Sequence, residues 1–393
     1  LLFVFISPQI NGQCYELVWS DEFNTTGFPD PEIWNMEVGN NNGSNNESQY
    51  YTRNDSDNCW IENGLLTITA RKENLGGQEY TSARINTKGK AEFQYGKIEA
   101  RLRLPFGQGI WPAFWTLGGN IDQVGWAQCG EIDIMELIGG SDPRDRTSYG
   151  TAHWADASGK NVSYGGSTTL ASGKFNDDFH VFSVEWNSQK IAWFIDGAEF
   201  HVISTTPSAL SEFQQKHFII LNLAVGGDWP GYPNSTTVFP QKFEVDYVRV
   251  YQNLSKETIE GKDSVLTKEK DLAFSLSEIE GRKYEWTVPE DVSIITGADS
   301  SVVNVNWGCT AGELTCKVTT TCSTQYTLKK TISLAEPEIS GPLFYDKTAG
   351  NLFFSVPVMN ETDYLWTVPA GGSFVTGDTA NAAEVVWGTE AGN

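Results

Sequence analysis

The stretch GEIDIMELIG, residues 130–139, carries three acids at Glu131, Asp133 and Glu136. Its isoleucine, methionine and leucine residues form a short apolar run between glycines, which predicts a β-strand. Side chains alternate between the two faces of a strand, so Glu131 and Asp133 share a face while Glu136 falls on the other. A β-bulge at the Ile-Met pair inserts one extra residue and returns Glu136 to the face of the other acids.

The alternative to a bulge at Ile134 and Met135 is an ordinary edge strand whose acids face solvent and only keep the protein soluble. A lone E-x-D-x-x-E pattern does not decide between the two. The residues around the stretch must therefore be considered.

The 393 residues include 50 acidic and 27 basic side chains, which gives a formal net charge of −23. This charge argues against nucleic acids, anionic membranes and sulfated polymers as partners, because the field of the protein repels them. A neutral polymer remains compatible with it. The 14 Trp and 14 Tyr residues supply flat amphipathic rings that stack on sugar faces as well as fill β-sheet cores. The 4 histidines are too few and too scattered for a histidine-based zinc site.

Residues 1–13, LLFVFISPQINGQ, read as an apolar run followed by Pro8 and small or polar residues. We interpret them as the remnant of a secretory signal peptide, and the alternative is a first strand that starts at Leu1. No later segment is apolar for long enough to be transmembrane. A secreted or cell-surface protein is therefore expected.

The cysteines would meet an oxidising compartment, where disulfides form. No C-x-x-C pair occurs, which argues against zinc, and the pairing cannot be deduced from sequence. Cys129 adjoins the acidic strand without a flanking histidine, so we interpret it as a buried structural thiol rather than a nucleophile. Because three cysteines lie in each half of the chain, at least one is expected to be unpaired unless a bridge joins the halves: Cys14, Cys59 and Cys129, then Cys309, Cys316 and Cys322.

The last third of the chain contains an internal repeat. The segment YEWTVPEDVSIITGADSSVVNVNWG from Tyr284 recurs as YLWTVPAGGSFVTGDTANAAEVVWG from Tyr364. One copy covers 258–336, and the second covers 337–393 without a counterpart to 314–336, so the sequence is expected to stop inside a module. Short strands between turn residues predict small immunoglobulin-like β-sandwiches that serve as spacers or binding modules.

Residues 14–252 form the first expected domain. Alternating or fully apolar segments such as LLTITARK, KIEARLRL and HFIILNLAVG are separated by Gly, Asn, Asp and Pro. Only Thr206–Lys216 has the pattern of a short helix. We expect an antiparallel all-β domain with two stacked sheets.

Seven ordered blocks cover nearly all of residues 15–252: ELVWSDEFN from Glu16, NNESQYYT from Asn45, GKIEARLRLPFGQGIWPAFWTLG from Gly96, CGEIDIMEL from Cys129, FHVFSVEW from Phe179, LNLAVGGDWPG from Leu221 and VDYVRVYQ from Val245. Together they resemble glycoside hydrolase family 16, specifically its bacterial laminarinases. The resemblance implies a curved, concanavalin A-like β-jelly roll with a sugar-binding cleft across its concave sheet. The C-terminal repeats resemble the PKD-like modules of secreted bacterial carbohydrate-active enzymes.

The resemblance also assigns the three acids. Laminarinases carry the bulged form of the motif, and the lichenases of the family have a regular strand one residue shorter. By this resemblance Glu131 is the nucleophile, Glu136 the acid/base and Asp133 their helper. The chemistry agrees, because retaining glycosidases use two carboxyl groups roughly 5 to 5.5 Å apart. Negative charge from Asp133 and Glu131 would keep Glu136 protonated near neutral pH, as a general acid requires.

Substrate-binding residues are implied on other strands of the same domain. Among the aromatic residues Trp111, Trp115 and Trp126, we expect Trp126 to be a subsite platform and regard Trp115 as the one most easily read as core. For Arg84, the alternative interpretation is a surface ion pair. Three polar residues correspond to family positions that hydrogen-bond the substrate near the cleaved bond: Asn45, Arg84 and His153.

No cofactor is expected for catalysis, but the family often binds one structural calcium ion far from the chemistry. By resemblance alone its ligands would be Glu22, a backbone oxygen at Gly64, and Asp246. Oxygen donors of this kind suit Ca²⁺.

The resemblance therefore implies a secreted, monomeric endo-β-1,3-glucanase that cleaves laminarin with retention of configuration. An agarase or a mixed-linkage glucanase of the same family remains an alternative, as does a non-catalytic β-glucan-binding protein or a structural protein built from the repeats. The complete set of acids argues against the two non-enzymes, and the few basic residues near those acids argue against carrageenan. The expected partners are β-1,3-glucan and its oligosaccharides, with no nucleic acid and no membrane span.

Overall fold

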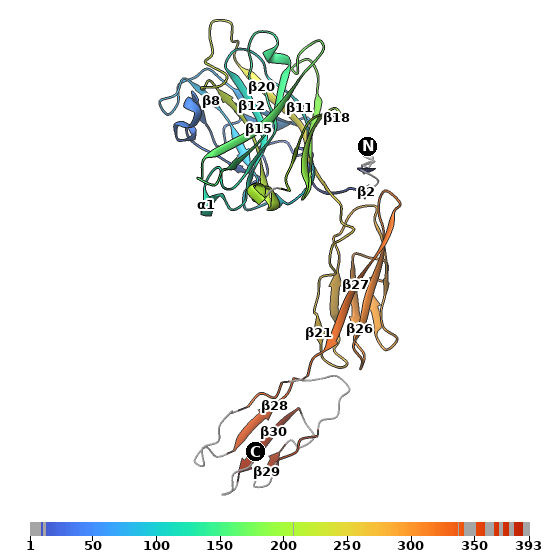
Figure 1. The fold of residues 1–393 in the computed structure, drawn as a ribbon. Coiled ribbons are helices and arrows are strands. Elements are labelled where there is room, and N and C mark those ends of the chain that lie inside the picture. The colour runs from blue at the N-terminus through green and yellow to red at the C-terminus, as the bar shows by residue number, and fades with distance from the viewer. Residues whose placement is uncertain are drawn as a thin grey trace. The chain divides into compact units, whose positions relative to one another are not determined.

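Figure 1 shows the computed structural model of the chain. Most of the predicted signal peptide, residues 1–13, lies outside the described residues. None of the helices in the described part is both long and apolar enough to cross a membrane. The chain divides into two compact units, one that contains residues 15–253 and a second that combines residues 8–14 with those from Leu254 onward. The structure describes residues 9–10, 13–206, 208–336, 338–341, 351–357, 365–368, 372–376 and 381–387.

The first unit consists of two eight-stranded antiparallel sheets, which confirms the predicted all-β jelly-roll architecture. The first, called here the β13 sheet, has the order β15 (Asn161–Thr169), β14 (Thr147–Ala155), β13 (Glu131–Glu136), β12 (Ile110–Gly118), β19 (His217–Val225), β9 (Arg84–Asn86) and β4 (Asn35–Met36), with β10 (Glu92–Phe93) also paired to β19. The second, the β11 sheet, has the order β18 (Ala198–Ser204), β17 (Lys190–Ile195), β16 (His180–Trp186), β11 (Gly96–Arg103), β20 (Gln241–Gln252), β7 (Leu65–Ala70) and β6 (Cys59–Glu62), with β3 (Glu16–Asp21) also paired to β20.

A continuous hydrophobic core is shared by the two sheets. Phe114, Ile132 and Leu221 contribute to it from the β13 sheet, while Ile98 and Val248 contribute from the β11 sheet, and all five are fully buried. Removal of this apolar surface from water is the main favourable term in folding. Because strand side chains alternate, the opposite face of the β13 sheet is free to carry polar residues.

Strand β13 contains the predicted bulge. On β12, Trp115 pairs with Asp133 and Ala113 with Glu136, and the register shifts between these two pairs. On β14 the register also shifts between Asp133 and Glu136, which pairs with Tyr149. One extra residue of β13 therefore lies between Asp133 and Glu136, and all three acids face the same side.

Helical structure in the first unit is confined to short segments. The predicted helix at Thr206–Lys216 corresponds to a 3₁₀ helix, η3 (Ser208–Gln214), between β18 and β19. The other short elements are η1 (Asn41–Asn46), α1 (Ile121–Val124), η2 (Arg144–Arg146) and the parallel pair β5 (Gln49–Tyr51) and β8 (Tyr80–Ser82).

The second unit contains the repeats. The first repeat is a small β-sandwich, the fold predicted for the repeats, and Tyr284, Trp286 and Trp307 are buried in its core. Its sheets have the orders β21 (Ser264–Val265), β27 (Gln325–Leu334), β26 (Gly312–Thr319), β23 (Lys283–Thr287), and β22 (Leu272–Ser275), β25 (Val302–Asn306), β24 (Ser293–Thr296). In the second repeat, the described strands form a sheet with the order β28 (Leu352–Ser355), β30 (Ala382–Trp387), β29 (Gly372–Thr376).

A disulfide joins Cys14 to Cys322, so one bridge does connect the two halves of the sequence. Cys14 follows β1 (Gln9–Ile10) at the end of β2 (Gln13–Cys14), and it belongs with the second unit rather than with the residues that follow it. The other cysteines are unbonded, and all but the exposed Cys309 are buried. Cys129 is fully buried, and burial raises the pKa of its thiol to about 11, so it is a structural residue as predicted.

Candidate active site

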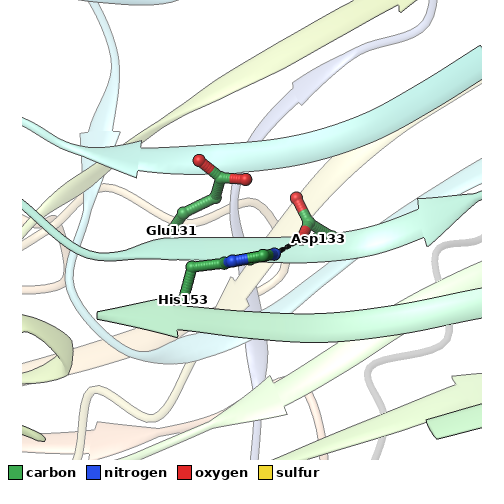
Figure 2. A group of neighbouring side chains, drawn as sticks. All are labelled: Glu131, Asp133 and His153. Carbon is green, nitrogen blue, oxygen red and sulfur yellow. Dashed lines mark ion pairs between the residues drawn. The ribbon is translucent and has the colours of Figure 1, made fainter. Parts of the chain in front are cut away.

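The polar face of the β13 sheet brings the acids together with His153. Glu131 pairs directly with His153 on β14, and Asp133 pairs with Thr151 one step further along. Figure 2 shows the carboxyl groups of Glu131 and Asp133 on the same side of β13, with the His153 ring reaching Asp133 from the neighbouring strand. Three of the residues predicted for the site therefore lie side by side.

Asp133 is the buried member of the set. Its side chain is 4% exposed, and Nε2 of His153 lies 3.2 Å from its Oδ2. Burial raises its pKa well above the usual value, and the neighbouring charge of Glu131 and a hydrogen bond shared with Glu131 act in the same direction. A protonated Asp133 can donate that hydrogen bond to the Glu131 carboxylate.

Glu136 is held in the environment of a general acid. Enclosure by protein raises its pKa well above the usual value, and the charges of Asp133 and Glu131 add to this effect. Nε1 of Trp111 donates a hydrogen bond of 2.9 Å to its Oε1, which acts in the opposite direction. A carboxyl group that stays protonated towards neutral pH can deliver a proton to a leaving oxygen.

Glu131 is oriented by the exposed Trp126. Nε1 of Trp126 donates a hydrogen bond of 2.7 Å to Oε2 of Glu131. The ring is 52% exposed and its centroid lies 6.2 Å from that of His153. An exposed indole next to the acids fits the expected role of a sugar-stacking platform.

Trp115, the tryptophan most easily read as core, is half-buried and packs against a small hydrophobic cluster that includes Leu117 and Ile220, rather than against the main core between the sheets. It lies on the same face as the acids, and its Nε1 donates a hydrogen bond of 2.7 Å to Asn222. The guanidinium carbon of Arg84 lies 4.8 Å from its ring centroid, and Nε of Arg84 is 3.1 Å from Oε1 of Glu37. Arg84 thus makes an ion pair, but with a side chain only 12% exposed it is not a surface pair.

Asn45 lies near Trp111 rather than beside the acids. Its side chain donates a hydrogen bond of 3.1 Å to Glu47, and its backbone oxygen accepts one of 2.9 Å from Asp228. A Cβ atom at Gly227 would lie 3.0 Å from the Asn45 oxygen and 3.4 Å from the Trp111 ring, so both residues flank this glycine. The structure does not show Asn45 in contact with any of the three acids.

Two aromatic residues of the site were not singled out in the sequence. The Trp229 ring lies 5.7 Å from that of Trp111 and 5.0 Å from that of Tyr149, and Trp229 is 42% exposed. Tyr149 faces the same side as Glu136, with which it pairs. Trp229 belongs to the LNLAVGGDWPG block, but it lies in a loop where no strand periodicity shows its direction.

Two groups of residues must be considered as metal ligands. Donor atoms of Glu131, Asp133 and His153 lie within 4.8 Å of one another, close enough to hold an ion. The same three residues already form a connected acid–acid–imidazole set, because Asp133 shares a hydrogen bond with Glu131 and contacts His153. The contacts among these three side chains are therefore equally compatible with an acid–base site that binds no metal ion.

The residues of the predicted calcium site are engaged with arginines. Both carboxylate oxygens of Glu22 accept hydrogen bonds from Arg249, at 2.8 and 2.7 Å, and Oδ2 of Asp246 accepts one of 2.7 Å from Arg101. Gly64 lies in the turn between β6 and β7. A calcium ion bound by these oxygens would have to displace two guanidinium groups, and the calcium site stays a prediction that metal analysis of the purified protein tests.

Comparison with known proteins places the chain in a family. The family described as glycosyl hydrolases family 16 matches residues 46–249, and the PKD-like domain family matches 252–332 and 333–393. A β-glucanase of Rhodothermus marinus is 41% identical over 249 residues, which cover 61% of this chain and 85% of that protein. The clotting factor G alpha subunit of Tachypleus tridentatus is 39% identical over 255 residues, but these cover only 36% of its length and 64% of this chain.

Among solved structures, the catalytic domain of a laminarinase from Thermotoga maritima superimposes with a TM-score of 0.55 at 46% identity. The alignment covers 61% of this chain and 98% of that domain. Since the family match includes more than half of the chain together with the bulged acidic strand, the protein belongs to family 16 of the glycosyl hydrolases and carries PKD-like repeats after its catalytic domain.

Proposed function

We propose that the protein is an endo-acting β-1,3-glucanase that hydrolyses its substrate with retention of configuration. The observation that carries this proposal is the bulge in β13, which gathers two glutamates and one aspartate on a single face. Each glutamate is held by the N–H of a different tryptophan, Trp126 for Glu131 and Trp111 for Glu136.

In the first step the Glu131 carboxylate attacks the anomeric carbon of the sugar. Glu136 gives its proton to the glycosidic oxygen, and the bond between that oxygen and the anomeric carbon breaks. The sugar is left as an ester of Glu131, and Glu136 is left as a carboxylate. Asp133 assists by donating its hydrogen bond to Glu131, which fixes the orientation of the attacking group.

In the second step Glu136 accepts a proton from a water molecule. The water oxygen attacks the anomeric carbon and releases the Glu131 carboxylate, so both glutamates return to their starting states. Two inversions at the same carbon give net retention of configuration.

β-1,3-Glucan is the substrate class that the surroundings favour. The Thermotoga relative is a laminarinase, and the Rhodothermus relative is a β-glucanase. Around the acids, Trp111, Trp126 and Trp229 offer partly exposed rings, which bind uncharged sugar faces. The net charge of −23 also favours a neutral polymer over a sulfated one.

The same proposal places the protein outside the cytoplasm. The disulfide between Cys14 and Cys322 supports this location, because disulfides persist in oxidising compartments. Polysaccharides too large to enter a cell are also degraded outside it.

Reducing-sugar release by the full chain tests the proposal. Laminarin, mixed-linkage glucan, agarose and carrageenan are compared, with Glu131→Gln as the inactive variant and Glu62→Gln, an exposed residue of β6, as the matched control. We expect laminarin to be hydrolysed fastest by the wild-type and Glu62→Gln proteins and not by Glu131→Gln. Hydrolysis of agarose alone, or turnover that survives Glu131→Gln, would contradict the proposal.

A further inference from the structure

We propose that Trp193 is a positioning residue for catalysis, because it holds the bulge of β13 from the opposite sheet and so fixes where Glu136 lies. This inference rests on the proposed function of Glu136 as the acid/base. Trp193 does not belong to the polar face of the site, and its indole N–H binds the backbone of Asp133 rather than an acidic side chain.

The contact runs across the hydrophobic core. Trp193 lies in β17 of the β11 sheet and is fully buried. Its Nε1 donates a hydrogen bond of 2.7 Å to the backbone oxygen of Asp133 in the β13 sheet. Asp133 is the last residue before the register shift that marks the bulge.

The direction of this carbonyl is a consequence of the bulge. Backbone carbonyls of a regular strand lie close to the plane of the sheet and point at the neighbouring strands. A carbonyl that accepts a hydrogen bond from the facing sheet must be turned out of that plane and into the core. A buried carbonyl without a hydrogen-bond partner is destabilising. Nε1 of Trp193 provides the donor for the Asp133 carbonyl at the bulge.

The Trp193 ring packs against Gly150 and His201. A Cβ atom at Gly150 of β14 would lie 2.4 Å from Cδ1 and 2.8 Å from Nε1 of Trp193, so only a glycine lets the ring lie against this strand. The ring of His201, which pairs with Trp193 from the neighbouring strand β18, lies 5.0 Å from the Trp193 ring. The position of the donor is therefore determined by packing, and with it the position of the Asp133 backbone.

The consequence for catalysis concerns Glu136. Only two residues separate Asp133 from Glu136, and both belong to the bulge. If the Asp133 carbonyl turns away from Trp193, the bulge rearranges and Glu136 moves relative to Asp133 and to the Trp111 N–H that binds it. A displacement of about 1 Å at a catalytic group is enough to lower the rate up to a hundredfold.

Trp193→Phe is the direct test, with Trp186→Phe as the matched control. Trp186 is also fully buried, lies in the same sheet and donates from Nε1 to a backbone oxygen, that of Phe213, at 2.9 Å. Both variants lose one buried hydrogen bond and part of one ring, so we expect similar losses of thermal stability. Only Trp193→Phe should lower kcat on laminarin, by about tenfold to a hundredfold.

Two further measurements distinguish a misplaced Glu136 from a general loss of structure: the dependence of the rate on the leaving group of the substrate, and the pH profile of kcat/KM. A dinitrophenyl glycoside needs no proton from Glu136, so its hydrolysis by Trp193→Phe should fall much less than that of laminarin. A displaced Glu136 should also lose part of the burial and of the neighbouring negative charge that raise its pKa, so the alkaline limb of kcat/KM should move to lower pH. The indole can be displaced with its N–H intact by Gly150→Ala, which should give the same pattern.

A carbon-13 NMR titration measures the pKa of the Glu136 carboxyl directly, so this test of the inference needs no substrate. The titration midpoint should fall in Trp193→Phe and stay unchanged in Trp186→Phe, even if the wild-type protein proves to hydrolyse none of the polymers. Absence of wild-type turnover would thus refute the proposed function alone. An unchanged midpoint in Trp193→Phe, or equal losses of kcat in the two tryptophan variants, would overturn the inference about Trp193.

Discussion

The raised pKa values of Asp133 and Glu136 make the folded protein less stable at neutral pH. In the unfolded chain their carboxyl groups titrate at ordinary values, whereas in the folded protein burial raises both pKa values, with added effects of Glu131 on Asp133 and of Asp133 and Glu131 on Glu136. The folded state then binds more protons than the unfolded state, so stability is highest below the unfolded pKa and falls as the pH rises through the folded pKa. The site is thus less stable at neutral pH than the same fold with neutral side chains would be.

Asp133→Asn is therefore expected to stabilise the protein in a pH-dependent way. The gain should be small near pH 4 and grow towards pH 7, within the range of about 0.5 to 2 kcal/mol that single stabilising substitutions give, while glucan hydrolysis decreases. Differential scanning calorimetry from pH 4 to 8 measures it, with Asp299→Asn, an exposed residue of the second unit, as the control. A gain that is constant with pH would show that the charge of Asp133 is not its cause.

Trp126 combines two roles that separate substitutions can resolve. Its exposed ring is expected to stack on a sugar, and its N–H binds Glu131. Trp126→Ala should raise KM for laminarin about tenfold, which corresponds to about 1.4 kcal/mol of binding, and should also lower kcat. Trp126→Phe keeps a ring, so it should lower kcat with little change in KM. Equal KM values for the two variants, both raised, would argue against stacking.

The bulge of β13 is the element that could be predicted from the sequence. Alternation along a strand is a local rule, and the odd spacing of Glu136 from the other acids violates it unless one residue is inserted. Trp193 could not be predicted as part of the site, because its contact comes from the other sheet and from a strand whose pattern shows only burial. The same holds for Trp229, whose direction is set by a loop and its packing against Trp111 and Tyr149.

Deletions in β13 test on which face of the strand Glu136 lies. Deleting Met135 leaves Glu136 four residues from Glu131, so simple alternation keeps it on the polar face without a bulge. We expect this variant to fold and to retain measurable laminarin hydrolysis. Deleting both Ile134 and Met135 turns Glu136 towards the core, which should abolish activity and lower Tm, because a buried carboxylate without partners is costly. Similar activity in the two deletion variants would contradict the assignment of faces.

The domain organisation of the whole molecule follows from repeats and blocks, but its covalent connectivity does not. The 80-residue spacing between Tyr284 and Tyr364 exposes the repeats in the sequence alone. The pairing of Cys14 with Cys322 depends on which β-sandwich the N-terminal segment joins, and sequence spacing contains no information on that choice. The calcium prediction likewise came from family positions, which say nothing of Arg249 and Arg101 beside the carboxylates.

Removal of the disulfide should destabilise the second unit while leaving catalysis intact. The bond links residues 308 positions apart, and disulfides that close long loops typically contribute about 2 to 4 kcal/mol. The double variant Cys14→Ser with Cys322→Ser should lower the unfolding temperature of the second unit, with kcat on laminarin unchanged. Cys309→Ser, which removes an exposed unbonded thiol, is the control. An unchanged unfolding temperature would show that the bond contributes nothing to this unit.

The central claim is that Glu131 attacks the substrate and Glu136 transfers the proton. A 2-fluoro laminaribiosyl fluoride tests it most directly, because the fluorine at carbon 2 slows hydrolysis of the glycosyl-enzyme and the fluoride leaves without protonation. Tandem mass spectrometry of the digested protein then locates the attached sugar. We predict one sugar per chain, attached to Glu131. A label on Glu136 or on any other residue, or hydrolysis of laminarin by inversion with no label at all, would contradict the account.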